Sequence, residues 1–140
     1  MRGQCQCGNL RIHWQNIDLS LVPRVCQCEF CRARALAWVS KSGTRVTLTI
    51  ANPGLYRILH QGTATVDFHC CTFCDTLVMA TCTSDGTTYG ALNANCMANP
   101  QGFGEPVPVT LDRDPLPQRM ERRRRNWCAP VIISRAALSS

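Results

Sequence analysis

The sequence predicts a mainly β protein with few or no long helices. Most of the first 92 residues form short segments in which apolar and polar side chains alternate between turn signals, as in half-buried strands. No segment before residue 93 keeps the helical period of apolar residues for three turns. A chain of 140 residues has the usual length of a single domain. We therefore expect one β-rich domain.

The alternating segments give the expected strands in chain order. In the first of them, Leu10, Ile12 and Trp14 alternate with polar residues. The last two are separated by Asp85-Gly86, a dipeptide that tolerates the positive φ of a tight hairpin turn. The expected strands cover residues 10–14, 46–50, 56–59, 64–70, 77–82 and 87–92.

The rest of the chain has a different character. The segment from Cys31 to Ala37 has room for one short turn of helix. Residues 93–117 hold five of the eight prolines, which predicts an extended segment that covers the sheet. Residues 118–126 are expected to be helical and the last dozen residues to be loosely held. We therefore divide the chain into a domain over residues 1–117 and a basic C-terminal tail over residues 118–140.

The formal net charge of +6 is concentrated at the C-terminus. Residues 1–117 hold nine Lys or Arg against eight Asp or Glu, whereas residues 118–140 hold six Arg against Glu121 alone. Residues 1–117 are thus nearly neutral, which argues against a globally basic nucleic-acid-binding protein. We interpret the run from Arg122 to Arg125 as a solvated helix face, because four consecutive arginines cannot bury themselves.

The cellular compartment decides how the cysteines are interpreted. The N-terminus has no apolar stretch of signal-peptide length, and nothing downstream approaches the roughly 18 apolar residues of a membrane span. We therefore expect a soluble, cytoplasmic protein. A reducing cytoplasm disfavours structural disulfides, so closely spaced cysteines indicate metal binding or catalysis. The odd count of eleven cysteines also argues against a fully paired disulfide framework.

Three close cysteine motifs predict two zinc sites, because cysteines a few residues apart on a tight turn present their thiolates to one ion. The motifs are Cys5/Cys7, Cys26/Cys28/Cys31 and Cys71/Cys74. The first and third together make a closed four-thiolate site. The middle motif supplies three thiolates and leaves one position of a tetrahedral ion open. Structural zinc sites are closed and catalytic ones keep a position for water or substrate, so the two predicted sites differ in role.

Two assignments stay open on these residues alone. A single metal cluster could use some of the seven thiols, with Cys70 or a histidine joining the middle motif. Either Cys70 or Cys71 could pair with Cys74, and we favour Cys71 because alternation puts Cys70 on an apolar face. Alternation puts His69 on the opposite face, and we favour a surface residue or one with satisfied hydrogen bonds over a catalytic histidine. Small buried hydrophobes are the expected role of Cys82, Cys96 and Cys128.

The order and spacing of these motifs resemble the glutathione-dependent formaldehyde-activating enzyme family, which includes the centromere protein V domain. The resemblance covers roughly residues 3–103 and is carried by Cys5-x-Cys7-Gly8, Cys26-x-Cys28-x-x-Cys31-Arg32 and Cys71-x-x-Cys74-Asp75-Thr76-Leu77. It implies an Mss4-like β fold, with a structural zinc on the first and third motifs and a labile, catalytic zinc on the middle one. This chain departs from the family pattern at Gln27, where histidine is usual, and at Asp75, where glycine usually closes the turn.

The resemblance implies a zinc-dependent carbon–sulfur lyase or synthase that acts on thiol–aldehyde adducts. The family's named activity is the condensation of formaldehyde with glutathione to S-(hydroxymethyl)glutathione. Zinc on the candidate catalytic residues Cys26, Cys28 and Cys31 would hold a thiol as thiolate for addition to an aldehyde carbon. The expected partners are a small thiol such as glutathione and an aldehyde. Candidate anchors for the carboxylates of the thiol are Arg24, Arg32, Arg34 and Lys41.

The competing class is a non-catalytic, zinc-stabilised binding module whose arginine run engages an acidic partner. A zinc-ribbon nucleic-acid protein is a weaker interpretation, because the β body lacks a basic stripe with interleaved aromatic residues.

Overall fold

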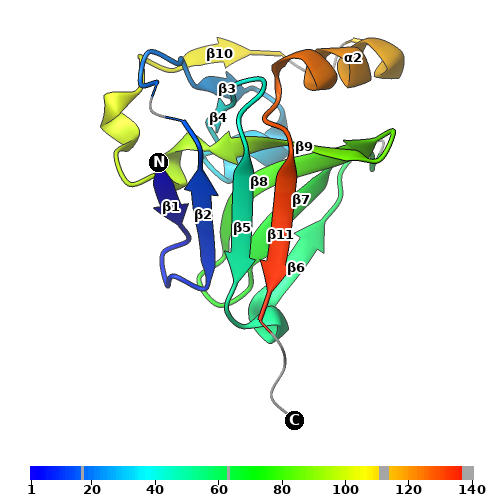
Figure 1. Cartoon of the computed structure of the whole chain (residues 1–140). Helices are drawn as coiled ribbons and strands as arrows, with labels where there is room; N and C mark the ends of the chain where they lie inside the picture. The colour runs from blue at the N-terminus through cyan, green and yellow to red at the C-terminus, as the bar shows by residue number, and fades with distance from the viewer. Residues whose placement is uncertain (17, 63, 111–113, 137–140) are drawn as a thin grey trace.

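Two β-sheets form the body of the protein (Figure 1). The computed structural model describes residues 1–16, 18–62, 64–110 and 114–136. The smaller sheet has the strand order β1-β2-β5-β11, and the larger has the order β10-β3-β4-β9-β8-β7-β6. The strands are β1 (Arg2–Gln4), β2 (Leu10–Trp14), β3 (Arg24–Cys26), β4 (Trp38–Val39), β5 (Val46–Ile50), β6 (Tyr56–Leu59), β7 (Asp67–Cys71), β8 (Thr76–Ser84), β9 (Thr87–Asn93), β10 (Val107–Val109) and β11 (Val131–Arg135).

Helical structure is confined to short pieces and one longer helix. The described helices are α1 (Glu29–Ala33) and α2 (Leu116–Asn126), with the 3-10 turns η1 (Pro53–Leu55), η2 (Ala94–Cys96) and η3 (Pro100–Gly102). Helix α2 lies at the upper end of the molecule together with β3 and β10 (Figure 1). The expected mainly β fold is therefore confirmed.

Strand β2 of the smaller sheet shows the alternating burial that the sequence predicts. In β2, Leu10, Ile12 and Trp14 are buried, whereas Arg11 and His13 point to solvent. Strand β2 pairs antiparallel with β5, and β5 pairs parallel with β11. Because successive side chains of a strand point to opposite faces, one face of this sheet is apolar and covers the core.

The hairpin of β8 and β9 is the centre of the larger sheet. Its turn has φ 53° at Asp85 and φ 80° at Gly86, the two positive values that a two-residue hairpin turn favours. Met79 lies opposite Leu92 in the register of this pair, and both belong to the core between the sheets. Neighbouring Ala80 faces the other way, into a second apolar cluster. The larger sheet is therefore buried on both faces here.

That second apolar cluster lies on the outer face of the larger sheet. It gathers side chains from β3, α1, β4, β7, β8 and β9 around Phe68. The Phe68 ring lies 4.8 Å from the ring of Phe30 and 6.1 Å from that of Trp38, measured between centroids. Its buried members are Cys26, Cys31, Leu36, Trp38, Val66, Leu77, Ala80 and Ala91, with Cys28, Phe30, Phe68 and Trp127 packed against them.

The strand expected over residues 64–70 is shifted along the chain. It begins at Asp67, because Ala64 has φ 57° and turns the backbone away from an extended course. The register against β8 shifts between His69 and Cys70, which face Met79 and Leu77 in turn. Both side chains are buried, because the larger sheet is covered on its two faces. The polar face expected for His69 is therefore wrong.

The His69 ring has both of its nitrogens satisfied inside the sheet. Its Nδ1 lies 2.6 Å from the Tyr56 hydroxyl, and its Nε2 lies 2.7 Å from the Thr81 hydroxyl. Burial lowers the pKa of His69 to about 4, so the ring is neutral near pH 7. Of the two roles expected for this residue, the satisfied one is confirmed.

The C-terminal residues are held more firmly than expected. Residues 116–126 form α2, close to the helix expected over 118–126. The last dozen residues were expected to be loosely held. Up to residue 135 this is wrong, because β11 pairs with β5 at five positions from Val131 to Arg135. Cys128 is also fully buried and exchanges backbone hydrogen bonds of 2.8 and 2.9 Å with Gly90. The boundary at residue 117 stays a prediction of domain organisation; residues 137–140 lie outside the described part.

The described part of the proline-rich segment lies along sheet edges, where Met97 forms a bridge with Gly3 and Ala98 N–H donates to the Arg2 carbonyl, and the expected cover over the sheet stays a prediction. It contains η2, η3 and the short strand β10, which pairs parallel with β3. Among the described residues, no helix has both the length and the apolar character needed to cross a membrane.

The packing of β11 against β9 can be tested at Gly90. A Cβ atom there would lie 2.8 Å from Val131 Cγ2 and 3.0 Å from Met79 Cε, both inside the core. Gly90→Ala should therefore lower the free energy of unfolding by about 1–3 kcal/mol, the usual cost of overpacking, in urea denaturation. Gly54→Ala is the control, because its Cβ would meet only the flexible Asn52 side chain at 3.2 Å. Equal stability of both variants would contradict this packing.

Candidate functional site

Two turns from distant parts of the chain bring four cysteines together. Cys5 and Cys7 lie in the turn between β1 and β2, and Cys71 and Cys74 lie where β7 turns into β8. All four Sγ atoms are within 4.8 Å of one another. The Sγ of Cys7 is 3.7 Å from that of Cys5 and 3.6 Å from that of Cys71. The four thiols that sequence spacing assigns to one closed site are therefore adjacent in space.

Local backbone geometry explains why these turns present their sulfurs. Gly8 has φ 81°, which only glycine adopts without strain, and its N–H closes the first turn on the Cys5 carbonyl at 3.1 Å. The backbone N–H of Leu10 points at Cys5 Sγ at 3.3 Å. In the second turn, Asp75 takes φ 56°, a left-handed conformation that aspartate tolerates better than most residues. This allows Asp75 to stand where the family pattern has glycine.

The sulfurs of this group share protons unequally. Burial raises the pKa of Cys5. Burial also acts to raise the pKa of Cys74, but hydrogen bonds from Thr76, from the Cys7 backbone and from the thiols of Cys5 and Cys71 outweigh it and lower that pKa to about 6. Cys74 thus ionises more readily than Cys5 and Cys7, whose pKa values are raised, with neighbouring thiols donating to it. A bound cation would replace these protons.

The second group forms where β3 enters α1. Cys26 ends the strand, Cys28 caps the helix and Cys31 lies within it. The Cys28 sulfur accepts a hydrogen bond from the Cys31 backbone N–H at 3.4 Å, which holds the turn that gathers the motif. The three Sγ atoms are within 4.8 Å of one another, with Cys26 and Cys31 buried and Cys28 half-buried. A hydrogen bond with Cys26 and burial raise the pKa of Cys31, so this thiol resists ionising without a cation.

Both groups can hold a metal ion, and their donors are compatible with zinc. Zinc bound by thiolates at about 2.3 Å in a tetrahedron places neighbouring sulfurs about 3.8 Å apart. In the first group, Cys7 Sγ lies 3.7 Å from Cys5 Sγ and 3.6 Å from Cys71 Sγ, which is already this spacing. The second group offers three soft donors and, among the described residues, no fourth His, Cys, Asp or Glu joins it.

The other cysteines stand apart from both groups. The Cys70 thiol points at the Cys71 carbonyl at 3.6 Å and does not join the adjacent four sulfurs. Cys82 and Cys128 are buried, as expected for small hydrophobes, and Cys96 is half-buried. The use of Cys71 rather than Cys70 as a ligand stays a prediction, which this placement favours.

A small cavity lies directly beside the three-cysteine group. It has a volume of about 110 Å³, and Cys31 forms part of its wall. Three aromatic side chains, Trp38, Phe68 and Trp127, make most of the remaining wall apolar. Arg24 and Arg123 are the cations that line it. A molecule that reached Cys31 through this cavity would meet aromatic surfaces and positive charge.

A wider cavity of about 390 Å³ adjoins the small one and shares Val66, Phe68 and Arg123 with it. Arg119 also lines this wider cavity. Arg119, Arg123 and Trp127 come from α2 and the residue after it, so the end of the chain contributes to the surroundings of Cys31. Local sequence patterns did not indicate these residues, and the solvated face expected for Arg122 to Arg125 is wrong for Arg123, which is 9 % exposed.

The cations expected to serve as carboxylate anchors are placed very differently from one another. Arg24 lines the small cavity. Arg34 lies with its guanidinium 4.0 Å from the centre of the Phe30 ring, and Lys41 pairs with Asp18 at 3.0 Å. Arg32 is exposed and lines neither of the two cavities. Only Arg24 of the four candidates lies where a ligand near Cys31 could reach it.

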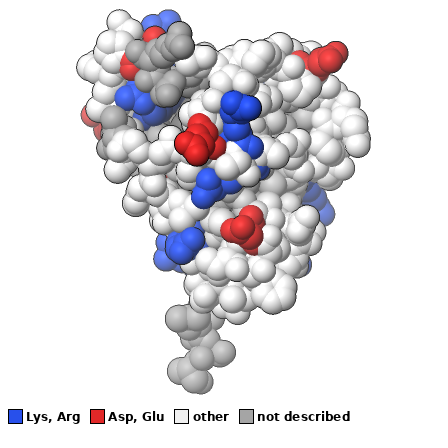
Figure 2. All heavy atoms as spheres, turned by 180° about the vertical axis from the view of Figure 1, so that it is seen from behind, with Lys and Arg blue, Asp and Glu red and all other residues white. Residues whose placement is uncertain are grey.

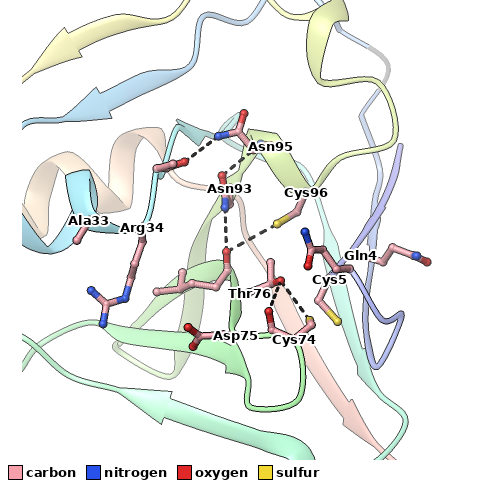
Figure 3. A pocket seen from close by; sticks show the side chains of 13 residues that line it. Gln4, Cys5, Ala33, Arg34, Cys74, Asp75, Thr76, Asn93, Asn95 and Cys96 are labelled. Atoms are coloured by element: carbon pink, nitrogen blue, oxygen red, sulfur yellow. Dashed lines mark hydrogen bonds between the residues drawn. The ribbon is translucent and has the colours of Figure 1, made fainter.

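A third cavity, of about 620 Å³, lies between the end of α1 and the four-cysteine group (Figure 3). Figure 3 shows Arg34 on one side of it and Cys5 and Cys74 of the four-cysteine group on the other. Two of its amides are engaged internally, since Asn93 donates to the Leu77 carbonyl at 2.9 Å and Asn95 donates to the Ala35 carbonyl at 2.8 Å. We therefore assign no chemistry to this cavity.

Comparison with known proteins agrees with the family that the sequence motifs resemble. The sequence model of the glutathione-dependent formaldehyde-activating enzyme family matches residues 1–110. A crystal structure of a Rhodobacter sphaeroides protein, described only as a structural genomics target, aligns with a TM-score of 0.57 and 19% identity. The alignment covers 76% of this chain and 100% of that chain. At this identity it shows a shared fold. A search of curated proteins gives no match.

The adjacent residues Cys70 and Cys71 offer a matched test of the four-sulfur group. Both are buried and both lose only Sγ on substitution by alanine. Cys71→Ala should lose about one metal equivalent per chain, because the four-thiolate site loses a ligand. Cys70→Ala should keep the wild-type metal content in elemental analysis of the purified protein. Metal loss from Cys70→Ala would show that the other cysteine of the pair is the ligand.

Proposed function

Because the chain belongs to the glutathione-dependent formaldehyde-activating enzyme family, we propose that it forms and cleaves the carbon–sulfur bond of a thiol–aldehyde adduct. The observation that carries the proposal is the opening of the three-cysteine group, through Cys31, onto an aromatic-walled cavity. The proposed ligands of this site are Cys26, Cys28 and Cys31. The four-cysteine group of Cys5, Cys7, Cys71 and Cys74 is proposed to hold a second, structural zinc.

The proposed reaction needs no oxidant or reductant. A thiol sulfur adds to the carbon of formaldehyde, a carbon–sulfur bond forms, the carbon–oxygen π bond breaks, and the thiol proton ends on the new hydroxyl. The reverse reaction cleaves the same bond. A zinc ion at the three-cysteine site would act as a Lewis acid that favours the thiolate form of a bound thiol near neutral pH.

The chain's own side chains would orient the thiol and keep water away. The β3–α1 turn fixes three sulfurs on one side of the cavity through the hydrogen bond from Cys31 N–H to Cys28. Trp38, Phe68 and Trp127 form apolar walls, which limit the water that could compete with the thiol for the aldehyde. Arg24 supplies positive charge on the cavity wall, which favours an anionic ligand.

A binding module that uses the arginine run is less well supported. Arg122 pairs with Asp114, and Arg124 and Arg125 both pair with Glu121. Figure 2 shows that the charged side chains on the face turned toward the viewer are few and of both signs. These ion pairs occupy the charges that an acidic partner would need. The proposed enzyme would act in the cytoplasm, where reducing conditions keep the eleven thiols free.

Catalysis can be tested by exchange NMR with ¹³C-formaldehyde and glutathione at equilibrium. The wild-type protein should accelerate exchange between free aldehyde and adduct, since a catalyst speeds both directions. Cys28→Ser should return the exchange rate to that of the uncatalysed mixture and leave a folded protein with about one zinc, because an open three-thiolate site contributes less to folding than a closed one. Cys96→Ser, outside both groups, is the control. A fully active Cys28→Ser would exclude this site.

The form in which the thiol binds can be tested by calorimetry. Glutathione should bind as the thiolate and release its proton, so the measured heat should differ between buffers of different ionisation enthalpy. Affinity should rise with pH toward the thiol pKa of roughly 8.5. S-methylglutathione keeps the rest of the molecule, but its sulfur cannot form a thiolate. It should therefore not bind measurably. Equal affinities of the two compounds would contradict thiolate binding.

A further inference from the structure

Helix α2 presents two arginines to the cavities beside the three-cysteine group. Arg119 and Arg123 are four residues apart, so they lie on one face of the helix, one turn apart. Both line the wider cavity, and Arg123 also lines the small cavity that contains Cys31. The two guanidinium groups are therefore part of the route by which a ligand would reach the proposed reaction site.

The charges of these two arginines are not balanced by a carboxylate of the described residues. None of the ion pairs among the described residues includes Arg119 or Arg123. Arg123 has neutral partners, with Nη1 donating to the Thr65 hydroxyl at 3.1 Å and lying 3.3 Å from Met120 Sδ. The Nε of Arg119 is buried and has no hydrogen-bond acceptor among the described residues. Arg122, Arg124 and Arg125 on the same helix each pair with a carboxylate, as described above.

This arrangement is costly unless an anion completes it. A buried charge without a counter-charge loses several kcal/mol of hydration. Two like charges four residues apart on a helix also repel each other. Burial lowers the pKa of Arg123; the neighbouring Cys82 thiol acts against this change, and the charges of Arg119 and Arg122 add to it. A carboxylate in the wider cavity would offset these costs by accepting charge-assisted hydrogen bonds from the guanidinium groups.

We propose that Arg123, assisted by Arg119, binds a carboxylate of the substrate, so that the site selects thiols that carry a carboxylate over neutral thiols. The inference rests on the proposed function, since it takes the sulfur of the same substrate to lie at the three-cysteine group. The wider cavity, at about 390 Å³, has the volume of a small-molecule site. Both arginines lie beyond residues 1–110, the part that matches the family, so this selectivity belongs to the C-terminal segment of this chain.

The first test changes the ligand and leaves the protein intact. Calorimetry compares glutathione with its diester, in which both carboxylates are blocked and the thiol is kept. The wild-type protein should bind glutathione about 10- to 100-fold more tightly, the range for losing a charge-assisted hydrogen bond. Equal affinities for the acid and the diester would overturn the inference, whatever the stability of any variant.

The second test identifies the residue of α2 that binds the substrate carboxylate. Arg123→Gln should weaken glutathione binding by about 10- to 100-fold and leave the affinity for the diester unchanged. Arg123→Lys should recover part of the lost affinity, because it restores the cation without the guanidinium fork. Arg125→Gln makes the same charge change at a side chain that is 74% exposed, and it should bind glutathione as the wild type does. Metal content and melting curves show whether each variant is folded.

The outcomes separate the two proposals. If the wild-type protein binds glutathione but folded Arg123→Gln binds it equally well, the role of α2 is overturned and the proposed function stands. An equal loss of affinity in Arg125→Gln would also overturn it, because the lower net positive charge of the protein would then explain the effect. If the wild-type protein binds neither thiol, the proposed function fails and the inference fails with it.

Discussion

The arrangement of this protein depends on the contact between two cysteine-bearing turns. Cys5 and Cys71 are fully buried in the core between the sheets, 66 positions apart in the chain. Asn9 strengthens the junction by donating to the carbonyls of Asn52 and Leu55, so the turn before β6 is held to the same point. Four thiols within 4.8 Å are a poor arrangement unless a cation replaces their protons. A metal there would close a long loop of chain, where cross-links gain most in loop entropy.

The surroundings of the three-cysteine group depend in turn on how the residues after α2 are anchored. Residue Cys128 is fixed to Gly90 by two backbone hydrogen bonds, and β11 then runs beside β5 in the other sheet. Helix α2 is therefore joined at its C-terminal end to the core of the protein. This places Trp127 against the apolar cluster around Phe68 and turns Arg123 inward. A strand that looks peripheral in the sequence thus positions two side chains at the cavity.

The arginine run shows how one property of a sequence can divide in three dimensions. Composition indicates a basic tail, and four consecutive arginines suggest a uniform exposed charge. On a helix, consecutive residues point in different directions, about 100° apart. Arg124 and Arg125 consequently reach Glu121 on the outer side, while Arg123 is buried. The face of the helix that packs on the body determines which of these charges can act on a ligand.

The sequence by itself determined the mainly β fold, the hairpin turn at Asp85-Gly86 and the grouping of seven cysteines. Those features depend on local periodicity, turn chemistry and ligand spacing, which act over a few residues. The tertiary structure decided that His69 is buried, because alternation along one strand does not show that both faces of the sheet are covered. It also decided that β11 completes the smaller sheet and that Arg123 lies beside Cys31. Parallel pairing and cavity walls join residues far apart in the chain, and local sequence patterns carry no record of such contacts.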